Sequence, residues 1–137
     1  MNDLRLFLIE RLCEAEAVAA AATAGPWTHE QGVAWVMDDT DTSPHAHEVV
    51  TSDDHRMGIT LTGPYGDPQS RMDARFIAEN DPARALRRIR AQLAMLTPHR
   101  RVEVDVLRLM AWEFLGHPDY RPEWEPMSTA PIGALVN

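Results

Sequence analysis

Breaks that contain proline divide this chain into short segments, and they constrain its fold more than any other feature of the sequence. They lie at Gly25-Pro26, Gly63-Pro64, Asp81-Pro82, Thr97-Pro98 and Gly116-His117-Pro118. Proline has no amide hydrogen to donate and disfavours a helical conformation in the residue before it, so a helix or strand tends to end at each break. A chain of 137 residues cut in this way predicts one small domain of short elements, which we place at 1–116. An extended tail at 117–137 follows, which is expected to pack back on the domain in part, with docking of a partner as the alternative.

The first segment has the spacing of an amphipathic helix over residues 3–23. Its apolar residues recur three or four positions apart. They are Leu4, Leu8, Leu12, Ala15, Ala19 and Ala22, with Phe7 and Val18 beside them. Glu10, Arg11 and Glu14 fall largely on the other side of this helix and are expected to face solvent. The single cysteine, Cys13, excludes an internal disulfide and is expected to be a small buried apolar residue.

The middle of the chain changes to the composition and alternation of strands. Residues 27–37, 47–51 and 57–62 predict two or three short antiparallel strands. Gln31-Gly32 is suited to a tight turn, and Ser52-Asp53-Asp54 to the hairpin loop between the last two strands. The polar residues between the first two strands predict a loop.

Three helices are predicted in the second half of the chain. The first covers 70–79, with Ser70 as its N-cap and Asp73 in the capping-box position. Its buried residues are expected to be Met72 or Phe76, with Ile77. A second helix begins after Asp81-Pro82, and a third covers about 99–115. The elements predict an α+β fold: an N-terminal helix, a small two- or three-stranded antiparallel sheet covered on one face by helices, three C-terminal helices, and an extended proline-rich tail.

The charge of the chain argues against general nucleic-acid binding. Its net charge is −8, and binding to phosphate backbones requires a basic surface. All 13 basic residues are arginine, and the acids are concentrated in the first half: residues 1–70 hold twelve acids and three arginines, and residues 71–137 hold nine acids and ten arginines. With no membrane-length apolar run and no secretory pattern at the N-terminus, a cytoplasmic protein without membrane contact is expected.

Three pieces of the sequence resemble known proteins. They are Ala22-Thr23-Ala24-Gly25-Pro26-Trp27, then Asp73-Ala74-Arg75-Phe76-Ile77-Ala78 with Asn80-Asp81-Pro82, and His117-Pro118-Asp119-Tyr120-Arg121-Pro122-Glu123-Trp124. The set resembles an uncharacterised family of small actinobacterial and actinophage proteins. The first two pieces are also similar to the ead-type early proteins of lambdoid phages, with Ala24 where proline is usual. The resemblance implies a phage or mobile-element origin and no catalytic residues, and the use of arginine alone agrees with an actinobacterial source.

Trp27 and a set of arginines form the first candidate site. Trp27 follows a break and can either plug the core or offer a stacking surface for a base. If the first two C-terminal helices pack antiparallel, their arginines cluster and can bind phosphate. These arginines are Arg71, Arg75, Arg84, Arg87 and Arg88. The competing interpretation is a solvated face that pairs with the acidic half of the chain.

The acidic segment 38–55 is the second candidate site, for a metal ion. It holds nine potential ligands in 18 residues, and His45 and His47 would point to the same side of an extended chain, with Asp41 nearby. No spacing here identifies a particular metal, so a solvated acidic loop is the favoured interpretation and no cofactor is expected.

The sequence leaves three functions open. It contains no G-x-S-x-G, P-loop or G-x-G-x-x-G motif, which favours a non-enzymatic accessory protein that binds a host or phage protein or self-assembles, with a homodimer as one form. The alternative is a protein that sequesters a nucleotide-like small molecule through Trp27 and the arginines, as a counter-defence. The weakest hypothesis is a metal-dependent hydrolase that uses the 38–55 segment.

Overall fold

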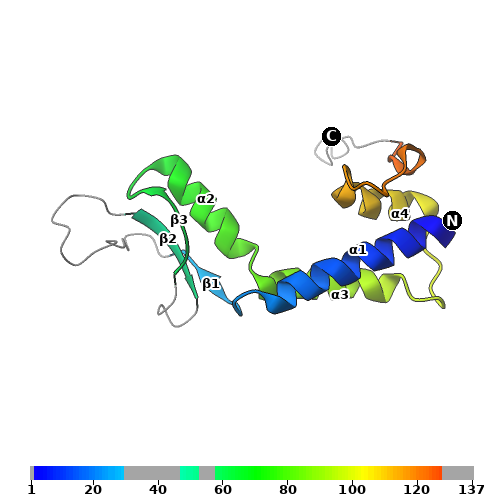
Figure 1. The fold of residues 1–137 in the computed structure, drawn as a ribbon, viewed down its shortest axis with the longest axis horizontal. Coiled ribbons are helices and arrows are strands. Elements are labelled where there is room, and N and C mark those ends of the chain that lie inside the picture. Colours follow the sequence, from blue (N-terminus) through cyan, green and yellow to red (C-terminus); the bar gives the residue numbers. More distant parts are fainter. Residues whose placement is uncertain (1, 30–46, 53–57, 128–137) are drawn as a thin grey trace, which may run out of the picture. The chain divides into compact units, whose positions relative to one another are not determined.

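The computed structural model describes residues 2–29, 47–52 and 58–127, and its fold class is α+β, as predicted (Figure 1). The chain divides into two compact units, each described here by itself. The helical unit consists of residues 1–15 and 89–137, and the sheet unit consists of residues 16–88. No helix in the described part of the chain is both long and apolar enough to cross a membrane.

The sheet unit contains three antiparallel strands in the order β1-β2-β3. These are β1 (Trp27–Thr28), β2 (His47–Ser52) and β3 (Gly58–Pro64). β2 lies in the centre and is buried along most of its length, and helix α2 (Pro68–Glu79) packs against all three strands. The two predicted strands at 47–51 and 57–62 are confirmed. Of the strand predicted at 27–37 the structure describes β1, while the turn at Gln31-Gly32 lies outside the described residues.

Helix α2 begins two residues before the predicted start, because the N-cap is Asp67 rather than Ser70. The Asp67 carboxylate accepts hydrogen bonds from the amide and the hydroxyl of Ser70, at 2.8 and 2.7 Å. Pro68 occupies the first turn, where its missing amide hydrogen costs nothing. The sequence Asp-Pro therefore starts this helix, as Asp81-Pro82 starts helix α3 (Pro82–Met95).

The buried face of α2 is also different from the prediction. Ser70 and Ala74 face the strands, while Met72 and Phe76 are 58% and 69% exposed. A small side chain at each contact lets α2 approach the sheet closely. The larger residues therefore lie on the outer surface of the helix.

The core of the helical unit is built on the first half of helix α1 (Asn2–Ala21). The buried residues of α1 are Leu4, Phe7, Leu8, Arg11 and Leu12. The rest of this core comes from Ile89 and Leu96 at α3, from Leu107 and Ala111 of helix α4 (Val104–Ala111), and from Trp124. α4 is shorter than the predicted helix at 99–115: it begins at Val104 and ends in a 3-10 turn, η1 (Trp112–Phe114). A second 3-10 turn, η2 (Pro122–Trp124), follows in the tail.

Three predictions about α1 are wrong. Cys13, expected to be buried, and Val18, expected beside the apolar stripe, are both exposed. Arg11 was expected in solvent but is only 8% exposed. The reason is its spacing, because Arg11 follows Phe7 by four residues and Leu8 by three, which places it on the same helical face.

The link between α1 and β1 depends on one buried carboxylate. Asp81 accepts the amide hydrogen of Trp27 at 3.0 Å and that of Arg84 at 2.8 Å, so it caps α3 and also anchors the start of β1. A Cβ atom on Gly25 would lie 2.6 Å from the same carboxylate, which explains why glycine stands there.

Candidate functional site

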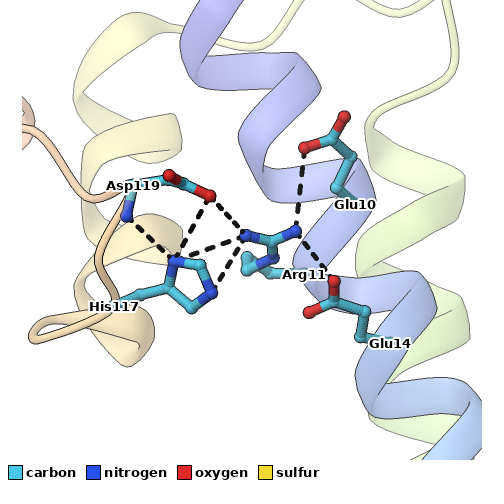
Figure 2. A network of polar contacts seen from close by, with 5 residues as sticks. All are labelled: Glu10, Arg11, Glu14, His117 and Asp119. Carbon is cyan, nitrogen blue, oxygen red and sulfur yellow. Dashed lines mark hydrogen bonds and ion pairs between the residues drawn. The ribbon is translucent and has the colours of Figure 1, made fainter.

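A buried arginine on α1 forms the centre of the polar network in the helical unit (Figure 2). The Arg11 guanidinium donates to Glu14 at 2.8 Å and lies 3.7 Å from Glu10, both on the same helix. On its other side it donates to Asp119 at 3.3 Å and contacts the ring of His117 at 3.0 Å. Arg11 therefore fastens the segment at 117–119 to α1 with charge-assisted hydrogen bonds.

His117 is surrounded by hydrogen-bond donors. Its Nε2 atom lies 3.0 Å from the guanidinium of Arg11, and its Nδ1 atom accepts the backbone amide hydrogen of Asp119 at 3.1 Å. The Arg11 guanidinium also lies 3.3 Å from Nδ1, so the tautomer that accepts at Nδ1 can receive both donors, and the other tautomer accepts from Arg11 at Nε2. The arrangement gives His117 the role of an acceptor that positions the chain.

Aromatic rings extend this contact along the tail. The Phe7 ring on α1 lies 4.9 Å from the ring of Trp124 and about 6 Å from those of Phe114, His117 and Tyr120, mostly edge to face. Such pairs stabilise a fold by roughly 0.5–1.5 kcal/mol each beyond the area they bury. Residues 117–124 are therefore packed on α1 by rings as well as by charge.

A groove lies between α1 and this segment. It has a volume of about 520 Å³ and is open to solvent. Its lining is Asp3, Leu6, Phe7 and Glu10 from α1, and Pro118, Asp119, Tyr120, Arg121, Pro122 and Trp124 from the tail. Three carboxylates and one guanidinium thus surround apolar and aromatic surfaces. The Arg121 guanidinium donates to Asp3 at 3.1 Å and lies 5.1 Å from the centre of the Trp124 ring.

The sheet unit brings two of the predicted ligand-binding residues together. Trp27 and Arg75 line a solvent-open pocket of about 330 Å³, with Thr28, His29, Ala78 and Glu79. The indole of Trp27 donates to the carbonyl of Thr23 at 2.9 Å, and Arg75 donates to Glu79 at 2.7 Å. The hydrogen bond to Glu79, then its charge, raises the pKa of Arg75, and the same pair lowers the pKa of Glu79.

The other four predicted arginines do not join this pocket. Arg71 donates to Glu48 at 2.9 Å and Arg84 donates to the carbonyl of Glu79 at 3.0 Å. Arg87 and Arg88 are exposed on α3. Binding of a ligand by these residues stays a prediction.

Glu48 is a buried charge that sequence reasoning missed, because it was counted within the acidic segment. Its carboxylate is fully buried in β2 and accepts from His29 Nε2 at 2.8 Å, from the amide of Gly66 at 2.9 Å and from Arg71. Burial by itself raises the pKa of Glu48, but these hydrogen bonds together outweigh it, so the pKa is lowered. The one available signal was its position beside two valines within a predicted strand.

The predicted metal site cannot be assembled from the described residues. His47 is the first residue of β2, while Asp41 and His45 lie outside the described residues. Within 2–29, 47–52 and 58–127, no group of three or more His, Cys, Asp or Glu side chains is placed to hold a metal ion.

The chain belongs to a family of unknown function (DUF6221), whose model matches residues 1–126. The expected membership of an uncharacterised family is therefore confirmed. Comparisons with curated proteins and with solved structures found no match.

Proposed function

We propose that this chain is a non-enzymatic binding protein that holds a segment of a partner protein in the groove of the helical unit. The observation that carries the proposal is the groove itself, with exposed carboxylates around aromatic and apolar surfaces. Beside the groove, the guanidinium of Arg11 is hydrogen-bonded to the ring of His117 and to the carboxylate of Asp119. Their contacts support a role in shaping the groove.

The openness of the groove favours a protein segment over a small molecule. Pockets for small ligands usually bury most of the ligand surface, which an open groove of this size does not do. A segment of a larger partner can place one or two side chains here and make further contacts elsewhere. The resemblance to actinophage and ead-type proteins adds that the partner is a host or phage protein, with self-association into a homodimer as the other form.

The test is a selection of displayed random peptides on the purified chain, repeated with two variants. Leu6 lines the groove and is 57% exposed, so Leu6→Gln changes the groove surface with little effect on the core. Leu109→Gln is the matched control, since Leu109 on α4 is 50% exposed and does not line the groove. We expect peptides whose binding is lost with Leu6→Gln and kept with Leu109→Gln. Peptides that bind all three proteins equally, or no enriched peptides, would overturn the proposal.

A second function is suggested by the pocket that Trp27 and Arg75 share, which is as open to solvent as the groove but brings an indole and a guanidinium together. There the indole offers a surface for stacking and the guanidinium offers a phosphate contact, which suits a nucleotide-like molecule that the protein sequesters. A thermal-shift screen against cyclic and linear nucleotides tests it, and one nucleotide should stabilise wild type but not Arg75→Gln. A flat screen removes this candidate. For the third hypothesis, a metal-dependent hydrolase, no observation in the described residues adds support.

A further inference from the structure

We infer that the segment bound in the groove is basic, an extended peptide that inserts an arginine or lysine side chain. This inference rests on the proposed function and adds the chemistry of the partner. The groove lining holds Asp3, Glu10 and Asp119 against the single cation Arg121. All three carboxylates are more than half exposed, so an incoming cation reaches them without a rearrangement of the fold.

The buried Arg11 does not cancel this negative character. Its guanidinium faces three carboxylates, those of Glu10, Glu14 and Asp119, and only one positive charge serves all three. Each carboxylate has about four acceptor positions, so capacity remains on its outer side. The groove therefore keeps an excess of negative charge, and its carboxylate oxygens can accept further hydrogen bonds.

Arg121 shows within the chain how the groove receives a guanidinium. Its charged group lies against the face of Trp124 while it donates to Asp3, which combines a cation–π contact with an ion pair. Leu6, Pro118 and Pro122 provide apolar surface beside these carboxylates. The aliphatic stem of an arginine or lysine from a partner can pack on that surface while its charged end reaches Glu10 or Asp119.

The charge of the whole chain acts in the same direction. A net charge of −8 attracts basic partners over distances of roughly a Debye length, about 10 Å at moderate salt. This attraction raises the rate of association more than it strengthens the final complex.

The experiment measures the affinity of labelled peptides for the full chain by fluorescence anisotropy. One peptide alternates arginine with leucine, and two matched peptides carry glutamine or glutamate in place of arginine. The double variant Asp3→Asn, Glu10→Gln removes two carboxylates from the groove lining. Glu103→Gln, Asp105→Asn is the matched control, because it changes the net charge equally on exposed residues outside the groove.

We expect the arginine peptide to bind about tenfold more tightly than the glutamine peptide, and to lose about tenfold with the groove variant but not with the control. Its affinity should fall as salt is raised. Equal binding of the glutamine and arginine peptides would overturn the inference, as would equal losses in the two variants. If displayed peptides depend on Leu6 but are not basic, the proposed function stands and this inference alone fails. If no peptide depends on Leu6, both fail.

Discussion

The helical unit buries a cation and the sheet unit buries an anion, and each buried charge contacts a histidine. Arg11 lies beside His117 and Glu48 beside His29, in both cases within 3.0 Å. The difference is in the remaining partners. Those of Arg11 are exposed carboxylates, whereas Glu48 is held by a backbone amide, by a buried imidazole and by Arg71.

This difference separates a network that shapes a surface from one that supports a fold. Around Arg11 the charges of opposite sign remain in contact with water and form one side of the groove. Around Glu48 the donors come from the end of β1, from the turn before α2 and from α2, so one carboxylate joins three parts of the sheet unit. Buried charges of either sign need partners, but only partners that face solvent can also serve binding.

The largest effect is expected from Glu48→Ala. It leaves a buried imidazole, an amide and a guanidinium without their acceptor, and breaking a buried pair in this way costs about 3–5 kcal/mol. Chemical denaturation followed by far-UV circular dichroism checks this value. The control is Glu79→Gln, which removes an exposed pair within α2 and should cost less than about 1 kcal/mol. Equal losses in the two variants would contradict the role given to Glu48.

A smaller loss is expected from Arg11→Met. Methionine keeps most of the apolar stem, and the carboxylates left behind are exposed and stay hydrated, so we expect a loss of about 1.5–3 kcal/mol. Amide hydrogen exchange should accelerate at 117–124, because the contacts that fasten this segment to α1 are lost. Unchanged exchange in that segment would show that the aromatic rings alone hold it.

The next effect is expected from acid, which should reduce the contribution of Glu48 to the stability of the sheet unit. The pKa of Glu48 is lowered in the folded chain, so its contribution to stability is complete above the unfolded pKa of about 4.5 and is lost as the pH falls through the folded value. Asp67 and Glu79 also have lowered pKa values, so the measurement is the difference in stability between wild type and Glu48→Gln from neutral pH to below 4. The difference should shrink as the pH falls, and a constant difference would contradict the assignment.

The smallest effect is expected from Tyr120→Phe in the helical unit. The Tyr120 hydroxyl is buried and has no hydrogen-bond partner among the described residues. Burial, and then the charge of Glu125, raises the pKa of Tyr120, so the hydroxyl stays protonated at neutral pH. Removing it should stabilise the chain by up to about 1 kcal/mol, measured as a rise in Tm. A clear loss of stability would show that the hydroxyl has a partner.

The elements could be predicted from the sequence, while the sites that join them could not. Asp81-Pro82 and the end of α2 at Glu79 are local signals, and both are confirmed. The spacing of Arg11 to Phe7 and Leu8 already places it on the buried face, but the ion-pair partners of the two buried charges are distant in the chain and could not be predicted: Arg11 meets Asp119, and Glu48 meets Arg71. Phe76 was predicted to be buried but is exposed. The buried face of α2 consists of the small residues Ser70 and Ala74, which a search for large apolar residues does not identify.

The carboxylate of Asp81 has a consequence for the dynamics of the sheet unit. The same side chain holds the amide hydrogens of Trp27 and Arg84, which belong to a strand and to a helix. Rotation of this one side chain would release both amides together, so we expect the start of β1 and the first turn of α3 to open as one cooperative unit. Their exchange rates should rise and fall in parallel when conditions change.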